Sequence, residues 1–408
     1  KIKLSKNSKN ILEIENNENL KTSQLKFYTF QSGFKKKDSD LLIIVFNNPV
    51  PVAAVYSKTS TPSAPIIWDK KNNNGLCKVL IVNSGNANAH TGVKGINNIN
   101  KYVKVAAKHF MCSLNQIMVS STGVIGEQID PNKIIKKINL IDNYKPTNLQ
   151  SASKTIMTTD TFAKTFHKKI KINKKDVNIY GMSKGSGMIA PNMGTMLAYI
   201  FIDADISKKF LKKLLINNLE NSFNAISVDG DTSTSDTVML FSLKKEREGK
   251  ITKTQDLKKI SNALFKVMFQ LALQVVSDGE GISKLIDVNV SGAKDYIQAK
   301  NVAFSIANSS LVKTAIAGED ANWGRVIMAI GKADTKINQN KIKLKFGNIT
   351  LASNGEKSKK ISIQKLDSYM KNKIIQISVD LGIGKSSKSV FSSDLTHDYI
   401  TINADYRS

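Results

Sequence analysis

Arginine is scarce in this chain, and this scarcity argues against nucleic-acid binding as the reason for its high positive charge. Of 60 basic residues only Arg247, Arg325 and Arg407 are arginine, and the formal net charge is +27. Such a charge is typical of proteins that bind nucleic acids or anionic membranes. Nucleic-acid readers, however, favour arginine, because its planar guanidinium makes bidentate and stacked contacts. The lysines here are scattered without interleaved aromatic residues, so we expect a solvated surface and no nucleic-acid or membrane partner.

Cysteine and histidine are also few. Cys77 and Cys112 are the only cysteines, too few for a disulfide framework, and we expect buried free thiols in a reducing compartment. The four histidines show neither an HExxH motif nor paired spacing, so no metal site is expected.

Long apolar runs are missing as well. No run approaches the roughly 20 residues that span a bilayer. Residues 1–20 contain no apolar core of a signal peptide, and Glu13, Glu15 and Glu18 are untypical of a transit peptide. We therefore expect a cytoplasmic protein.

The pattern of apolar residues predicts strands and helices in irregular alternation. The chain of 408 residues is long enough for two or three domains, but no linker marks a boundary. Without a regular βαβ repeat, we expect an α+β fold of mixed α/β layers, not a Rossmann sheet. Strands are predicted at 41–48, 51–57, 79–89, 117–126, 196–202, 287–293, 302–308, 342–352 and 374–382, and helices at 103–110, 203–226 and 257–278.

Thr195 stands between a glycine-rich segment and an apolar strand. The sequence KGSGMIAPNMGT (184–195) runs directly into MLAYIFI (196–202). Gly194 has no Cβ, so the Gly194–Thr195 peptide can bend toward the Thr195 hydroxyl at little steric cost. Attack of the hydroxyl on this peptide would divide the chain and leave Thr195 with an α-amine that can serve as its base. On this pattern alone, an ordinary loop with an incidental threonine is the alternative.

Other short polar turns end apolar segments. SSTGVIG (120–126) could present a hydroxyl and an N–H to an oxyanion, because Gly123 allows close approach. MTTDT (157–161) brings three hydroxyls near a carboxylate, and DGEG (278–281) places Glu280 where it could bind a substrate amine. Each of these turns is open to a purely structural interpretation as a turn or helix cap.

Two segments are similar to known ligand-binding loops, but each lacks a glycine that the loop requires. GIGKS (382–386) is similar to a phosphate loop, but the required first glycine is replaced by Val379. The Asp229-Gly230-Asp231 cluster is similar to a calcium loop, but Thr234 stands where that loop needs glycine.

Eight motifs in one order carry a family resemblance. Together they resemble the ornithine acetyltransferase family of arginine biosynthesis, the glutamate N-acetyltransferases, over nearly the whole chain up to Ser408. One such motif is a weak signal, whereas the ordered set is specific. The motifs are NSGNANAHTG, STGVIG, IMTTDT, KGSGMIAPNMGTMLA, SVDGDTSTSDT, DGEG, GEDANWGR and INADYRS.

The resemblance implies a role for particular residues. Thr195 would be the nucleophile and the first residue of a β chain (195–408), released by autocleavage after Gly194 from an α chain (1–194). Thr122 and Gly123 would form the oxyanion hole. The substrate-binding positions would be Thr158, Lys184, Thr195, Glu280, Asn403 and Ser408.

The resemblance also implies an activity and an assembly. The enzyme would move the acetyl group of N2-acetylornithine to Thr195 and then to glutamate, without metal or cofactor, as an α2β2 heterotetramer with a layered, self-cleaving fold. Whether acetyl-CoA is a second acetyl donor, which would make the enzyme bifunctional, stays open. One alternative is a self-cleaving amidohydrolase or aminopeptidase, in which water replaces glutamate. The other is a basic nucleic-acid or scaffold-binding protein.

Overall fold

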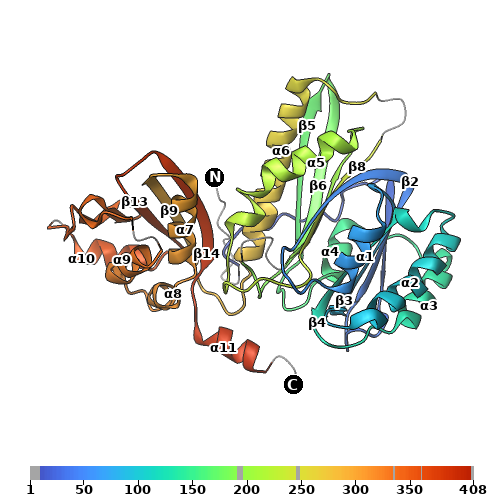
Figure 1. Ribbon diagram of the computed structural model, residues 1–408, viewed down its shortest axis with the longest axis horizontal. Coiled ribbons are helices and arrows are strands. Elements are labelled where there is room, and N and C mark those ends of the chain that lie inside the picture. Colours follow the sequence, from blue (N-terminus) through green and yellow to red (C-terminus); the bar gives the residue numbers. More distant parts are fainter. Residues whose placement is uncertain (1–9, 191–195, 245–248, 334–335, 360, 406–408) are drawn as a thin grey trace.

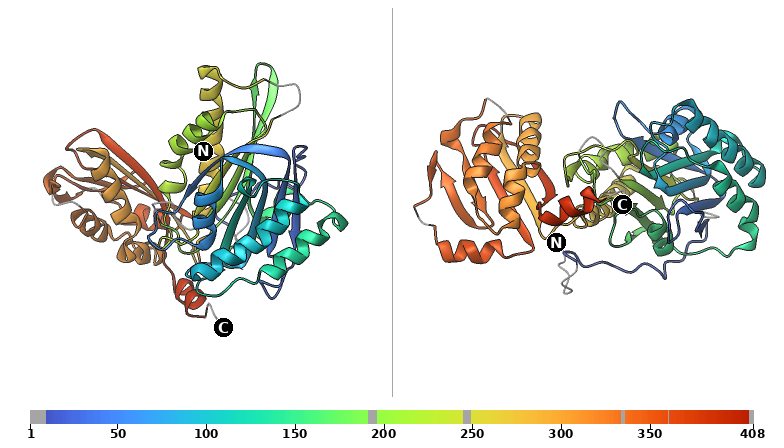
Figure 2. Two further views of the ribbon diagram at one scale, coloured as in Figure 1. Left: turned by 45° about the vertical axis from the view of Figure 1, so that its right-hand side comes forward. Right: turned by 90° about the horizontal axis from the view of Figure 1, so that it is seen from below.

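Two β-sheets organise the chain, and each forms the centre of its own body (Figures 1 and 2). The computed structural model describes residues 10–190, 196–244, 249–333, 336–359 and 361–405. The larger body contains the first sheet, and the smaller body, in orange and red, contains the second (Figure 1). Helix α11 (His397–Ala404) follows the last strand of the smaller sheet and lies below and between the two bodies in this view.

The larger sheet has the strand order β4-β3-β2-β8-β7-β6-β5, and β1 pairs with β2 at one side. Its pairs are antiparallel except β3–β4 and β7–β8, which are parallel. The strands are β1 (Leu25–Phe30), β2 (Leu41–Tyr56), β3 (Leu76–Asn86), β4 (Ile117–Val124), β5 (Lys164–Ile172), β6 (Lys175–Lys184), β7 (Leu197–Ile202) and β8 (Thr237–Ser242).

Strand β2 connects the two halves of this sheet. The sequence predicts two strands here, whereas the structure contains one strand of 16 residues. Its first part pairs with β1 and β3, and its last part pairs with β8. The ladder to β3 shifts register between Val45 and Val50, where Pro49 has no N–H to donate. The irregularity lets one strand serve both halves.

The two halves of the larger sheet pack face to face between layers of helices. Strand β7 shows the pattern: Leu197, Tyr199 and Phe201 enter the core between the half-sheets, while the alternate residues face helices α5 and α6. Residues of β2 and β3 alternate in the same way between this central core and a cluster under α1, α2 and α3. The result is four layers, helix–sheet–sheet–helix, which confirms the expected mixed α/β layers and excludes a Rossmann sheet.

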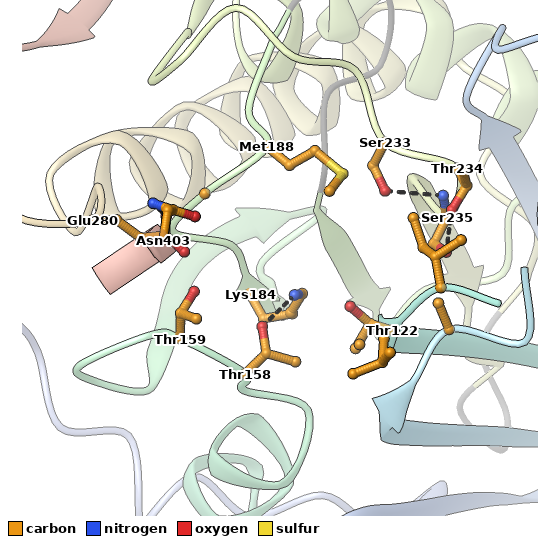
Figure 3. A pocket seen from close by; sticks show the side chains of 15 residues that line it. Thr122, Thr158, Thr159, Lys184, Met188, Ser233, Thr234, Ser235, Glu280 and Asn403 are labelled. Carbon is orange, nitrogen blue, oxygen red and sulfur yellow. Dashed lines mark hydrogen bonds between the residues drawn. The ribbon is translucent and has the colours of Figure 1, made fainter. Parts of the chain in front are cut away.

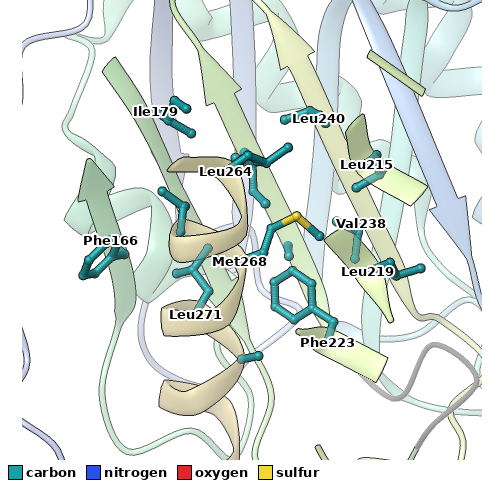
Figure 4. Packing of buried hydrophobic residues seen from close by; sticks show 14 of the residues in the cluster. Phe166, Ile179, Leu215, Leu219, Phe223, Val238, Leu240, Leu264, Met268 and Leu271 are labelled. Atoms are coloured by element: carbon teal, nitrogen blue, oxygen red, sulfur yellow. The ribbon is translucent and has the colours of Figure 1, made fainter. Parts of the chain in front are cut away.

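Helices α5 and α6 cover the outer face of β5 to β8 (Figure 4). Helix α5 begins after Ser207, whose side chain accepts the N–H of Phe210 and so caps the helix. Helices α1, α3 and α4 of this body were not predicted from the sequence. The helices of this body are α1 (Ala64–Asn72), α2 (Gly92–His109), α3 (Pro131–Leu140), α4 (Leu149–Thr155), α5 (Lys208–Leu219) and α6 (Thr254–Val276), with short 3-10 turns at Leu114–Gln116, Ile141–Asn143 and Phe223–Ala225.

The smaller body has the strand order β12-β11-β10-β13-β9-β14 with helices packed on it. Only the β9–β13 pair is parallel among the pairs of this sheet in the described residues. Its elements are β9 (Leu285–Ala293), α7 (Tyr296–Ala307), α8 (Ser310–Ala317), α9 (Trp323–Gly331), a 3-10 turn (Gln339–Lys341), β10 (Lys343–Phe346), β11 (Ile349–Ser353), β12 (Glu356–Lys357), α10 (Ile363–Met370), β13 (Ile374–Asp380) and β14 (Ser386–Ser393).

One predicted strand and the predicted burial of one cysteine are wrong. The predicted strand at 302–308 lies almost entirely in helix α7, which begins after Asp295, whose side chain accepts the N–H of Gln298. A short apolar run of this composition predicts a buried strand, but here it forms part of a helix that is buried on several sides. Both cysteines are free, and Cys77 is buried as expected, but Cys112 is only partly buried.

Among the described residues, no helix combines the length and the apolar character needed to cross a bilayer.

The central core predicts a large effect of one aromatic truncation. Phe201 is fully buried and stacks on Tyr180 and on Phe241, with ring centroids 5.2 Å apart in both pairs. We expect Phe201→Ala to lower the free energy of unfolding by about 3–5 kcal/mol, because the half-sheets cannot close over the cavity left behind. Urea denaturation followed by circular dichroism measures this. Ile363→Ala, at a side chain that is 72% exposed, should change stability by less than about 0.5 kcal/mol. Equal effects would refute the assigned core.

Candidate active site

A cavity of about 300 Å³ brings together predicted site residues that are far apart in the sequence (Figure 3). Its lining includes Thr122, Gly123, Thr158, Lys184, Glu280 and Asn403. The three remaining predicted residues, Gly194, Thr195 and Ser408, lie outside the described residues. The other described lining residues are Ala87, Val124, Ile125, Thr159, Gly187, Met188, Ser233, Thr234 and Ser235.

Thr122 and Gly123 occupy the end of strand β4. The parallel ladder between β3 and β4 becomes irregular at Gly85 and Asn86, directly opposite them. Gly123 has φ 132°, and a Cβ there would lie 2.3 Å from the carbonyl carbon of Gly85. Only glycine fits this close approach of β4 to β3, and Thr122 and Gly123 both line the cavity.

Lys184 is a buried cation at the end of strand β6. Its side chain is almost fully buried, and Nζ donates a hydrogen bond of 2.9 Å to Thr158 Oγ1. Burial lowers the pKa of Lys184, the Asp160 carboxylate opposes this shift, and the neighbouring Lys164 ammonium adds to it. The ammonium is therefore poorly solvated and available to a nearby negative charge.

Glu280 and Asn403 face the cavity from the DGEG turn and from helix α11. Asn403 Nδ2 donates to Glu280 Oε2 at 2.7 Å. The glycine-rich segment passes close by, since a Cβ on Gly187 would lie 2.5 Å from the Glu280 carboxylate. Of the described residues that line the cavity, only Lys184 and Glu280 are charged. One cation and one anion are thus available to a zwitterionic ligand.

A buried ion triad supports this lining, and the sequence analysis missed it. Lys164 Nζ lies 2.6 Å from a carboxylate oxygen of Asp160 and 2.6 Å from one of Asp278, and the Lys164 side chain is fully buried. Burial would raise the pKa of Asp160, but Lys164 and then Lys184 hold it well below its usual range. For Asp278 burial outweighs Lys164, and its pKa is raised. Asp160 and Asp278 belong to recognised motifs, but nothing in the sequence marks Lys164 as their partner.

The triad joins the three segments that carry Thr158, Lys184 and Glu280. Asp160 accepts the N–H groups of Thr158, at 3.1 Å, and of Gly185, at 2.7 Å. Asp278 accepts the N–H of Thr161 at 2.9 Å, and its own carbonyl accepts the hydroxyl of Ser186 at 2.5 Å. Segments that meet only in the folded chain are thus held by charge-assisted hydrogen bonds.

The turn before β8 contributes a second group of lining residues that sequence reasoning missed. Ser233, Thr234 and Ser235 border the cavity, and Ser235 N donates to Ser233 Oγ at 3.1 Å. Their motif, SVDGDTSTSDT, is one of the eight that carry the family resemblance, but no role was predicted for these three residues. In the part of the chain that the structure describes, no cluster of histidine, cysteine, aspartate or glutamate side chains is suited to a metal ion.

Comparison with known proteins assigns the family. A model of the ArgJ family matches residues 26–408. The chain belongs to the ArgJ family. The arginine biosynthesis bifunctional protein ArgJ of Mesorhizobium japonicum is 46% identical over 388 residues, which cover 93% of this chain and 94% of that protein. The protein of the same name from Bartonella henselae is 44% identical over 391 residues, which cover 95% of both chains.

One solved ArgJ structure is also similar. The arginine biosynthesis bifunctional protein argJ of Bacillus halodurans is 38% identical to this ArgJ-family chain, with a TM-score of 0.48. The match covers 52% of this chain and 100% of that chain.

The buried triad predicts unequal effects for two lysines of strand β5. We expect Lys164→Met to destabilise the fold by about 3–5 kcal/mol, because two buried carboxylates lose their shared cation. Lys169, on the same strand, forms an ion pair of 3.2 Å with Asp176, and both side chains are about half exposed. Lys169→Met should therefore change stability by less than about 1 kcal/mol. Denaturant midpoints compare the two, and a similar small effect for both would rule out a structural role for the triad.

Proposed function

We propose that this chain is a glutamate N-acetyltransferase, which moves the acetyl group of N2-acetylornithine to glutamate through an acetylated Thr195. The observation that carries the proposal is the shared cavity of Thr122, Gly123, Thr158, Lys184, Glu280 and Asn403. Membership of the ArgJ family and the names of its relatives, which refer to arginine biosynthesis, support the substrate class.

In the first half-reaction, the Thr195 hydroxyl attacks the acetyl carbonyl of N2-acetylornithine. The Thr195 α-amine accepts the hydroxyl proton as a new C–O bond forms. The Thr122 hydroxyl and the Gly123 N–H would stabilise the oxyanion, which is the largest single contribution in many acyl transfers. The C–N bond then breaks, the proton passes from the Thr195 amine to the α-nitrogen of ornithine, and acetyl-Thr195 remains.

In the second half-reaction, the α-amine of glutamate attacks acetyl-Thr195. A C–N bond forms, the C–O bond breaks, and the proton of the attacking amine returns to the Thr195 oxygen by way of its α-amine. Glu280 would bind a substrate amino group, and Asn403 and Ser408 would bind the α-carboxylate. The Lys184 ammonium, which donates to Thr158 Oγ1, would stabilise the negative charge that develops on the substrate in each transition state. One amide replaces another, so neither step requires a metal or cofactor.

The same hydroxyl would mature the enzyme. Thr195 Oγ attacks the carbonyl carbon of Gly194, the C–N bond breaks, and the hydroxyl proton moves to the released α-amine. Water hydrolyses the resulting ester and leaves Gly194 as a carboxylate at the end of an α chain (1–194), with Thr195 opening a β chain (195–408). Relatives that are named bifunctional proteins of arginine biosynthesis support a second activity, and we propose acetyl-CoA as a second acetyl donor.

The sheet explains why two such chains would stay together. Strands β7 and β8 follow Thr195, yet they pair with β6 on one side and with β2 on the other, and both of these precede Gly194. The α and β chains would share one core and separate only on unfolding. Two of these pairs would form the α2β2 heterotetramer, and we place the enzyme in the cytoplasm, where its two thiols stay reduced.

Acetyl transfer tests the proposed function directly. Purified protein with N2-acetylornithine and glutamate should produce N-acetylglutamate, whereas Thr195→Ala should produce none, because it lacks the acyl-accepting hydroxyl. Thr314→Ala, at an exposed threonine of helix α8, is the matched control and should keep full activity. Chromatography of the acetylated products measures the outcome. Release of acetate in place of N-acetylglutamate would indicate a hydrolase, and turnover by Thr195→Ala would contradict the nucleophile.

We also predict that the chain is cleaved and that the α and β chains remain associated. Under denaturing conditions, intact mass should show two fragments that join at Gly194 and Thr195. Under native conditions the fragments should elute together, because β7 and β8 lie inside the sheet of the other fragment. A single chain in an active preparation would contradict self-cleavage. Native separation of the fragments would contradict the shared core.

A further inference from the structure

The segment before strand β8 holds the chain at two places, on either side of residues 190–195. We call residues 227–237 the bracing loop. At the first place, the Asp229 carboxylate accepts the N–H groups of Met188, at 2.6 Å, and of Ile189, at 2.9 Å. Two further hydrogen bonds end on the carbonyl of Ile189, one of 2.8 Å from Val228 N and one of 3.2 Å from Ser227 Oγ.

At the second place, the bracing loop holds Met196, the residue that follows Thr195. Asp236 Oδ1 accepts the N–H of Met196 at 3.0 Å, and Thr237 N donates to the Met196 carbonyl at 3.0 Å. The Asp236 side chain is completely buried. Both places are therefore held by a carboxylate together with backbone hydrogen bonds.

The bracing loop is itself anchored on several sides. Lys313 Nζ donates to Val228 O at 2.7 Å, and the Tyr399 hydroxyl donates to Asp229 at 3.1 Å. On the other side, Ser57 Oγ donates to Ser233 O at 2.8 Å, and Ser63 N donates to Thr234 O at 2.8 Å. These anchors come from the smaller body, from helix α11 and from the first third of the chain. The loop is thus a fixed support for residues 188–189 and 196.

The bracing loop holds the chain at Ile189 and at Met196, which lie on either side of the proposed cleavage site. Residues 189 and 196 are both attached to the bracing loop, so residues 190–195 must connect two points whose separation is set by the fold. Restricting a reactive segment in this way raises the fraction of time in which a hydroxyl and a neighbouring carbonyl carbon can meet.

We propose that Asp229 and Asp236 are positioning residues for self-cleavage, which hold the chain on both sides of the Gly194–Thr195 bond. This inference rests on the proposed function, in which the Thr195 hydroxyl attacks Gly194 and water completes the hydrolysis. After cleavage the bracing loop belongs to the β chain, and its contacts to Met188 and Ile189 retain the end of the α chain beside the cavity. Neither aspartate touches the reacting atoms in this proposal.

The test follows the rate of cleavage after a short pulse of cell-free synthesis of the full chain. Denaturing electrophoresis and intact mass give the cleaved fraction over time, with Thr195→Ala as the uncleaved reference. We expect Asp236→Ala and Asp229→Asn to slow cleavage by about tenfold or more, because side-chain hydrogen bonds to the flanking residues are lost. Asp231→Asn is the matched control, because Asp231 lies in the same loop and is exposed, and it should cleave at the wild-type rate.

A conservative variant separates positioning from a general loss of folding. Asn at position 236 retains an oxygen that can accept the Met196 N–H, so Asp236→Asn should cleave faster than Asp236→Ala. If Asp236→Ala fails to fold, the cleavage rates of Asp229→Asn and Asp236→Asn are compared with that of Asp231→Asn, provided that the melting temperatures agree. Rates equal to that of Asp231→Asn in both variants then overturn the inference. Wild-type rates in folded Asp229→Asn and Asp236→Ala overturn the inference and leave the proposed function intact. An active wild-type chain that never cleaves overturns self-cleavage itself.

Discussion

One buried lysine holds the candidate site together. Lys164 Nζ lies 2.6 Å from both Asp160 and Asp278. Asp160 in turn accepts the N–H groups of Thr158 and Gly185, and Asp278 accepts that of Thr161. Three chain segments depend on this arrangement, because two unpaired carboxylates would be very unfavourable in the interior. The triad also sets the electrostatics of the cavity, since Asp160 favours the charged form of Lys184 and Lys164 disfavours it.

The sheet order connects the architecture with the proposed maturation. Strands β7 and β8 lie between β2 and β6, so a break after Gly194 would divide the covalent chain but not its core. The bracing loop begins before β8 and contacts the chain on both sides of the proposed break. The nucleophile, the structural integrity of a cleaved chain and the positioning of the cleaved bond would therefore depend on the same pair of strands.

Much of the site could be predicted from the sequence, because eight motifs in one order resemble a known family, whereas each polar turn alone was open to a structural interpretation. The described residues that this resemblance implies line one cavity: Thr122, Gly123, Thr158, Lys184, Glu280 and Asn403. Lys164 was missed, because a lysine in a strand looks like any other of the many lysines until its burial is known. Residues 302–308 were assigned to a strand because a short apolar run fits a buried strand or a buried helix equally well.

The sequence by itself determined the local requirements: glycine where backbones approach closely, polar caps at helix starts, apolar strands, and a family signature in eight motifs. It could not determine which strand lies beside which. Burial of both faces of β7 follows from the packing of two half-sheets. Lys164 is buried between two carboxylates, one from the loop before β5 and one from the turn after α6. Only the tertiary structure decided these features, because desolvation and charge pairing act between residues that are more than a hundred positions apart, as Lys164 and Asp278 are.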